Sequence, residues 1–192
     1  AALAIWSVAG LWQFPNAMPD TLTLKTWMRA APRIAGALFT TFVVAAAATI
    51  IAVALAIMCL VHENDTGRRY TLPLVYLPLV VPQVAFLFGL QLLFVLTGTV
   101  ASLPALILAH LVFVMPYVFL SLSDPWRAYD RRYEAISAGL GKSRTATLWR
   151  VRAPMLTRAI LTAAAVGFAA SVGQYLPTLL VGAGRLPTVT TE

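Results

Sequence analysis

The sequence predicts an all-α protein built as a polytopic bundle of transmembrane helices. Of its 192 residues, 60% are hydrophobic and 11% are charged, whereas ordinary soluble domains carry about 25% charged residues. Several apolar runs contain no charged side chain over the roughly 20 residues that a helix needs to cross a bilayer. Basic residues gather between these runs. Composition and spacing therefore place the chain in a membrane.

Four apolar runs are long enough to cross the membrane as helices. They are residues 34–61, 71–96, 103–123 and 159–181. Three prolines interrupt the first half of the second run, and Gly173 and Pro177 permit a bend in the fourth. The sequence HENDTGRR, at 62–69, is expected to form a hydrated turn after the first run.

The first 33 residues are expected to form a separate segment. Residues 1–12 are apolar but too short to span alone, so we interpret them as the end of a helix whose beginning is missing. A secretory signal is the weaker interpretation, because no charged leading region precedes them. Lys25, Arg29 and Arg33 recur every four residues, which suits a short helix lying in the membrane interface.

The expected division of the chain follows. Residues 1–33 hold a partial first helix and an extracytoplasmic or interfacial segment. Residues 34–192 form the transmembrane core, which includes a long polar loop at 124–158. We expect the protein to be incomplete at both ends, with a further helix beyond residue 192.

The lysines and arginines that flank the runs predict the orientation, since positively charged loops stay on the cytoplasmic side. With alternating spans, one side of the membrane holds Arg68, Arg69, Arg127, Arg131, Arg132, Lys142, Arg144, Arg150, Arg152 and Arg158. The other side holds Lys25, Arg29, Arg33 and Arg185. The loops at 62–70 and 124–158 are therefore predicted to be cytoplasmic.

The loop at 124–158 is too polar to span and is patterned as two short helices around a glycine turn. Gly139 and Gly141 are expected to supply the positive φ that ends the first helix. Ser143 is placed to cap the second helix, which should run until Pro154 interrupts it. Small side chains in the first helix would let another protein approach closely.

Residues 133–156, YEAISAGLGKSRTATLWRVRAPML, resemble the cytoplasmic coupling loop (EAA loop) of bacterial ABC-importer permeases, the MetI-like inner-membrane components of binding-protein-dependent transport systems. Gly141 and Pro154 stand at the family spacing, with Leu148 between them at an apolar position. The family glutamate falls at Ala135, so Glu134 stands one residue early. The resemblance covers about residues 36–178, and SVGQYLPTLLVGAGR, at 171–185, looks closest to thiamine-type permeases.

This resemblance implies a multi-pass permease subunit of the bacterial inner membrane that moves a small solute inward. It also implies three protein partners: cytoplasmic ATP-binding subunits, an extracytoplasmic solute-binding protein, and a second permease half, identical or different. By resemblance, the ATPase-docking residues are Glu134, Ala135, Ser137, Ala138, Gly139, Gly141 and Pro154. The alternative interpretation of the same stretch is a plain polar connection between helices.

Polar residues within the apolar runs should face protein or water rather than lipid. The candidates for a solute pathway are Gln83, Gln91, Ser171, Gln174 and Tyr175. Contacts between packed helices are the alternative role, and the stronger one for Gln83 and Gln91. His110 also lies within a run, where we interpret it as a neutral group bonded to a neighbouring helix rather than as a proton relay.

Other kinds of site are not predicted. GLGKS at 139–143 lacks the glycine that a phosphate-binding loop needs at position 136, where Ile136 stands. His62, Glu63 and Asp65 diverge on a short turn, so we expect no metal site. We also expect no catalytic residue and no cofactor. The net charge of +7 lies at the membrane borders, where topology explains it, so nucleic-acid binding is not expected.

Two other classes of function remain as alternatives. A transporter or channel driven by an ion gradient should carry acidic or basic residues inside its spans, and the predicted spans carry none. A membrane anchor or assembly protein would tolerate substitutions at Gly139 and Gly141 without loss of solute uptake.

Overall fold

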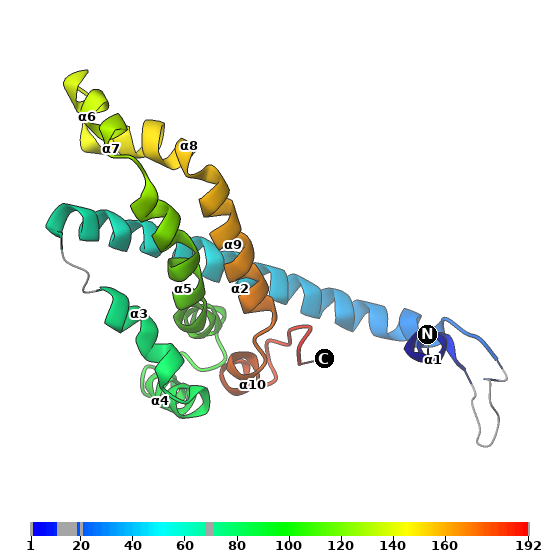
Figure 1. Ribbon diagram of the computed structural model, residues 1–192. Coiled ribbons are helices and arrows are strands. Elements are labelled where there is room, and N and C mark those ends of the chain that lie inside the picture. Colours follow the sequence, from blue (N-terminus) through cyan, green and yellow to red (C-terminus); the bar gives the residue numbers. More distant parts are fainter. Residues whose placement is uncertain (1, 11–18, 20, 68–70, 192) are drawn as a thin grey trace.

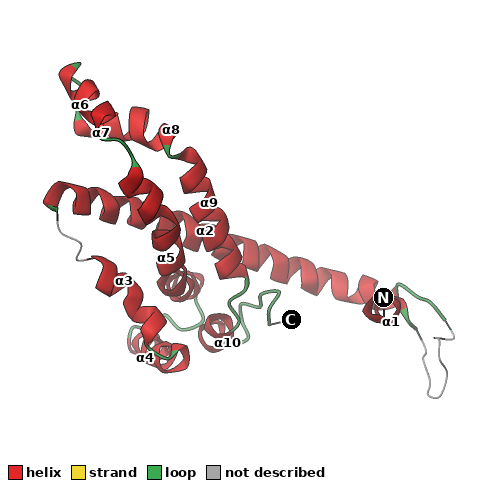
Figure 2. Cartoon of the chain, in the orientation of Figure 1, coloured by secondary structure: helices red, strands yellow, loops and turns green. Residues whose placement is uncertain are grey.

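The computed structural model describes residues 2–10, 19, 21–67 and 71–191. In these residues the regular elements are helices, and a single isolated bridge joins Ala9 to Leu22 (Figure 2). The elements are α1 (Ala2–Val8), α2 (Lys25–Thr66), α3 (Thr71–Val80), α4 (Gln83–Leu96), α5 (Leu103–Ala128), α6 (Arg132–Gly139), α7 (Arg144–Thr147), the π-helix η1 (Leu148–Arg152), α8 (Ala153–Met155), α9 (Thr157–Val172) and α10 (Leu176–Gly182). The predicted all-α class is confirmed.

α2 is a 42-residue helix that passes through the bundle and continues beyond it (Figure 1). Alanines line its packed face, and Ala45, Ala48, Ala52 and Ala56 are almost completely buried. Such small side chains let helix backbones approach closely in a membrane, where packing rather than hydrophobic burial drives association. The helix ends at Gly67, whose φ of 68° is the left-handed conformation common after a helix C-terminus.

The length of α2 corrects two expectations. Lys25, Arg29 and Arg33 belong to the first turns of α2 itself, so the prediction of a separate interfacial helix is wrong, and α2 crosses the expected boundary at residue 33 without a break. The hydrated turn expected from residue 62 is also wrong, because α2 remains helical to Thr66. Arg68, Arg69 and residues 11–12 lie outside the described residues.

α5 and α9 pack against α2 and complete the core. α2 and α5 are each long and apolar enough to cross a membrane, as predicted. Gly167 permits the closest approach, because a Cβ atom there would lie 2.5 Å from Val118 Cγ2. The core beside the loop at 124–158 contains Leu60, Leu122 and Trp126, all fully or almost fully buried.

The other two predicted spans are each broken into two helices. Residues 71–96 form α3 and α4, which separate at Pro82, where the extended conformation (ψ 122°) and the missing N–H interrupt the helix. Residues 159–181 lie mainly in α9 and α10, which separate between Gly173 and Tyr175. Both runs are therefore helical but interrupted, and the prolines and glycines that the sequence places there mark both breaks.

Helices α6 to α8 form an arm at one end of the bundle, whereas α4 and α10 lie at the opposite end (Figure 1). We call residues 132–155 the coupling arm. The helical stretch Arg144–Met155 meets α9 at a bend of 76°. The arm therefore departs sharply from the bundle axis and stands beside the C-terminal end of α2.

Candidate functional site

Local interactions build the coupling arm in the way the sequence predicts at two positions. Gly141 has a φ of +72°, and the N–H of Gly141 donates to the carbonyl of Ala138 at 2.9 Å. Ser143 caps α7, since its Oγ accepts from the N–H of Ala146 at 3.3 Å. Gly139 lies inside α6 and is absent from the glycines with positive φ, so that part of the prediction is wrong.

Pro154 does not end the second helix of the arm. It lies in the first turn of α8, directly after the π-helix, and the helical stretch continues to Met155. Pro154 lies inside the continuous helical stretch Arg144–Met155, and the wider turn of the π-helix directly before it accommodates the missing N–H. The bend follows at Leu156, so the predicted end at Pro154 falls slightly early.

The outer side of the arm carries an exposed apolar face that sequence reasoning missed. Tyr133, Ile136 and Leu140 recur at helical spacing on α6, and Leu140 is 73% exposed. They line an apolar hollow of about 260 Å³, which we call the outer pocket, together with Val151 from the π-helix. Trp149, also on the π-helix, is 65% exposed. The i, i+3, i+7 spacing on α6 was the available signal.

The opposite side of α6 faces the end of α2. Glu134, Ala135 and Ala138 line a hollow of about 560 Å³, which we call the inner groove, together with Asn64 and Asp65 of α2. The predicted docking residues are thus divided among several environments. Glu134, Ala135 and Ala138 line the inner groove, Ser137 is buried, and Gly139, Gly141 and Pro154 are exposed.

Arg152 is the most buried charged side chain of the arm, with 5% of the side chain exposed. Its Nη1 donates to Glu134 Oε1 at 2.9 Å, and its Nη2 donates to the backbone carbonyl of Trp126 at 3.1 Å. The guanidinium lies 4.1 Å from the centroid of the Trp126 ring and 5.0 Å from that of Tyr129. The Glu134 carboxylate is therefore engaged inside the chain.

Electrostatics at Arg152 are dominated by burial. Burial lowers the pKa of the guanidinium, and the neighbouring Glu134 carboxylate opposes that shift. Burial also raises the pKa of Tyr129, with the negative charge of Glu134 adding to the rise. Since arginine stays protonated in proteins, the cation persists and needs its carboxylate and carbonyl partners.

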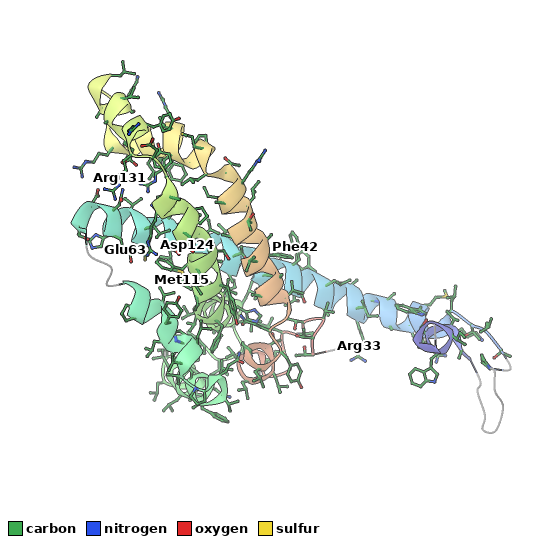
Figure 3. All side chains as sticks on the ribbon, in the orientation of Figure 1. Arg33, Phe42, Glu63, Met115, Asp124 and Arg131 are labelled. Carbon is green, nitrogen blue, oxygen red and sulfur yellow. The ribbon has the colours of Figure 1, made fainter. Side chains whose placement is uncertain are left out.

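The C-terminal turns of α2 contact the end of α5, the connection from α5 to α6, and the coupling arm. Glu63 Oε2 pairs with Arg127 Nη2 at 3.0 Å, and Asn64 accepts a hydrogen bond from Arg131. Asp65 pairs with Arg144 at 3.6 Å in an exposed position. Figure 3 shows Glu63 and Arg131 at this same end of the molecule. The end of α2 and the loop after α5 therefore share one side of the bundle, as the charge pattern predicts.

A second candidate site lies where the two helix breaks face each other. A hollow of about 750 Å³, which we call the break hollow, is lined by Gln83 at the α3–α4 break and by Gln174 and Tyr175 at the α9–α10 break. Phe113 and Tyr117 of α5 complete its wall. Among the described residues, its lining contains no charged side chain. Three of the five predicted pathway residues thus come together here.

The other two predicted pathway residues lie elsewhere. Ser171 is buried and its Oγ lies 2.9 Å from His110 Nδ1, while His110 Nε2 lies 3.1 Å from Thr178 Oγ1. His110 therefore bonds α9 and α10 on both sides of their break, which agrees with its interpretation as a group bonded to neighbouring helices. Gln91 lies on α4 and does not line the break hollow.

Comparison with known proteins gives several related permeases. The chain is 35% identical over 143 residues to the inner membrane ABC transporter permease protein YnjC of Escherichia coli. It is 31% identical over 156 residues to the molybdenum transport system permease protein ModB of Mycobacterium bovis and of Mycobacterium tuberculosis. These matches use 74% and 73% of this chain, and they span 28% of the first relative and 59% of each of the others.

The family comparison covers most of the helices described above. The sequence profile described as "Binding-protein-dependent transport system inner membrane component" matches residues 48–192. This stretch contains the coupling arm, the second half of α2 and both helix breaks. The chain therefore belongs to the family of inner membrane components of binding-protein-dependent transport systems.

Proposed function

We propose that this chain forms part of the membrane pathway of an ATP-driven importer of a small solute, and that residues 133–156 couple it to a separate cytoplasmic ATPase. The observation that carries this proposal is the exposed apolar face of the coupling arm. Buried contacts hold one side of the arm against the rest of the chain, and the other side exposes apolar side chains to which a partner protein could bind.

The apolar face supports a protein partner rather than solvent. Tyr133, Ile136, Leu140 and Trp149 leave much of their apolar surface exposed beyond the membrane-spanning part of the chain. Burial of such surface favours association by about 25 cal/mol per Å² of apolar area removed from water. The partner that fits the family is the ATP-binding subunit. Hydrolysis would occur there, since the sequence lacks a phosphate-binding loop.

The break hollow is the proposed pathway segment. Discontinuous helices form solute sites in transporters because their unwound backbone and polar side chains line a cavity inside the membrane. Gln83, Gln174 and Tyr175 supply amide and hydroxyl groups of this kind. A second permease half would enclose the hollow, and an extracytoplasmic solute-binding protein would deliver the solute.

The class of solute can be determined by measuring the uptake of several candidate solutes. Two of the relatives are named for molybdenum transport, whereas the stretch at 171–185 resembles thiamine-type permeases. Molybdate and thiamine are therefore the first two solutes to compare, in the presence and absence of ATP. Uptake that persists without ATP and follows a proton or sodium gradient would favour the ion-gradient alternative instead.

The docking proposal is tested by co-purification in detergent of the full-length protein with the ATPases encoded beside it. Ile136→Asp places a charge in the outer pocket, and Ala138→Asp places the same charge in the inner groove, so the two variants are matched. We expect Ile136→Asp to abolish capture and Ala138→Asp to retain it. Capture that is lost only in Ala138→Asp would assign docking to the small-residue side. Equal capture by both variants and wild type would contradict the proposal, provided that all three elute as monodisperse protein.

A further inference from the structure

The contacts of Arg152 join two parts of the chain that are not adjacent in sequence. Arg152 ends the π-helix of the arm, and its partners are Glu134 on α6 and the Trp126 carbonyl on α5. The arm continues directly into α9 through the bend at Leu156. The chain also joins the arm to α5 through residues 129–131. Arg152 therefore gives the arm a second attachment to α5, a buried side-chain contact in addition to this chain connection.

This second attachment is strong because it is buried. The Arg152 guanidinium lies over the rings of both Trp126 and Tyr129, and 5% of the side chain is exposed. Separation of a buried cation from its carboxylate and carbonyl partners would leave an uncompensated charge in a poorly hydrated site. When α6 moves, the end of α5 therefore moves with it, because the Arg152 contacts resist relative movement of the two helices.

The remaining contacts make the arm itself stiff. Ser137 Oγ and Thr147 Oγ1 lie 2.7 Å apart in a buried hydrogen bond between α6 and α7. Ser143 caps α7, and α7 continues without interruption into the π-helix that carries Arg152. The exposed apolar face of α6 and the buried Arg152 thus belong to one unit.

α5 extends from this unit to the break hollow. Trp126 contacts Arg152 at one end of α5, and Phe113 and Tyr117 line the hollow farther along the same helix. His110, also on α5, bonds Ser171 and Thr178 on both sides of the α9–α10 break. A movement of α5 would therefore reach the wall of the hollow and the adjoining helix break together.

We propose that Arg152 is a positioning residue that makes the coupling arm and α5 move as one body, so that movement of a docked ATPase reaches the break hollow through α5. This inference rests on the proposed function, because it requires an ATPase on the arm. It assigns Glu134 to an internal contact that holds Arg152 in place.

The test uses the full-length protein with its ATPase in proteoliposomes and needs no knowledge of the solute. Cys59→Ser is combined with replacement of any other cysteine of the full-length permease, and Gln83→Cys places a thiol in the break hollow. The readout is the ratio of the rates at which a membrane-impermeant maleimide alkylates this thiol in the vanadate-trapped and nucleotide-free states. In this background we expect trapping to change the rate at least about fivefold, the lower end of ordinary coupling between sites.

Arg152→Gln should bring that ratio to about one, meaning no transmitted change, while ATPase capture on the arm is unaffected. Arg152→Lys, which retains the cation, should restore part of the change. Arg158→Ala removes an exposed arginine of α9 and serves as the control, with the full response expected. A purely structural role for Arg152 would lower stability without this selective loss of the trapping response.

Three outcomes decide the inference. A full trapping response in Arg152→Gln with intact capture would overturn it. If Arg152→Gln does not assemble, Glu134→Gln decides in the same way, because it removes the partner charge and keeps the side-chain shape. Absence of any trapping response with Arg152 and Glu134 intact would overturn the proposed function, and this inference with it.

Discussion

Glu63 and Arg127 form an ion pair of 3.0 Å between the last turns of α2 and α5. The Glu63 side chain is 7% exposed and the Arg127 side chain 27%, so the carboxylate is buried while the guanidinium reaches water. It joins two helices through residues that lie 64 positions apart in the sequence. The pair therefore holds the ends of these two helices together just where the coupling arm departs.

Arg127→Met should lower the free energy of unfolding by about 1–3 kcal/mol, because a buried carboxylate loses a charged hydrogen-bond donor. Arg144→Ala is the matched control, since the side chain of Arg144 is 91% exposed in its pair with Asp65. The control should change stability by less than about 1 kcal/mol. Thermal unfolding in detergent measures both variants, and equal losses would contradict the distinction between the two pairs.

Gly167→Ala should destabilise the packing of α9 on α5. The added Cβ would lie 2.5 Å from Val118 Cγ2, and overpacking of a close contact costs about 1–3 kcal/mol. Val118→Ala in the same protein should recover part of the loss, because it removes the opposing methyl groups. Gly36→Ala, where no atom lies within 4 Å of the added Cβ, is the control. A double-mutant cycle without coupling would contradict the predicted contact.

His110→Leu should weaken both the fold and solute uptake. It removes the hydrogen bonds of Ser171 and Thr178, which are buried, at a cost of about 1–3 kcal/mol for each group left unsatisfied. The α9–α10 break beside the break hollow would then lose both side-chain bonds to residue 110 and keep the bond from Gln174 Nε2 to the backbone carbonyl of that residue. His110→Gln can keep one of the bonds and should lie between leucine and wild type. Unchanged uptake in His110→Leu would show that the hydrogen bonds of His110 to Ser171 and Thr178 are not needed for solute transport.

Gly141→Val should reduce ATPase capture. Gly141 has a φ of +72° and no atom within 4 Å of an added Cβ, so the penalty comes from backbone conformation alone. We expect a cost of about 1–2 kcal/mol for the turn between α6 and α7. Gly139→Ala, in the helical conformation of α6 and equally open space, should bind the ATPase like wild type. Equal losses in both variants would point to the surface of the loop rather than the turn.

Tyr129→Phe should make the protein less sensitive to alkaline pH. Burial raises the pKa of Tyr129, so the folded state disfavours the phenolate. A raised pKa contributes stability that is present below the unfolded value of about 10 and is lost as the pH rises through the folded value. The wild type should therefore lose stability above about pH 10, and Tyr129→Phe should lose less. Melting temperatures measured from pH 8 to pH 11 in detergent test the difference; parallel curves would contradict it.

Elements with a strong local signal could be predicted from the sequence. The uncharged runs identified the membrane-crossing parts of α2 and α5, and local chemistry identified the cap at Ser143 and the turn at Gly141. The helix breaks were only partly predictable. Pro82 and Gly173 permit a bend, but whether an apolar run bends depends on what packs beside it.

The site depended on long-range contacts that one sequence does not reveal. The docking role of Glu134 stays a prediction, and the sequence does not reveal that its carboxylate also binds Arg152, which is 18 residues away. Burial of Arg152 follows from the arrangement of α5 and the arm, not from local pattern. The apolar face at Tyr133, Ile136 and Leu140 can be predicted from its helical spacing, but its exposure depends on which elements pack against α6.

The length of α2 determines from which side of the membrane a water-soluble reagent can reach each of its ends. A helix of 42 residues rises about 63 Å, roughly twice the thickness of the hydrocarbon core. Even a strongly tilted helix of that length leaves both of its charged ends in water. Arg29 and Asp65 are both exposed, so a thiol placed at either position would react with a reagent added to its own compartment only. One helix can therefore establish the inside and outside of the whole protein.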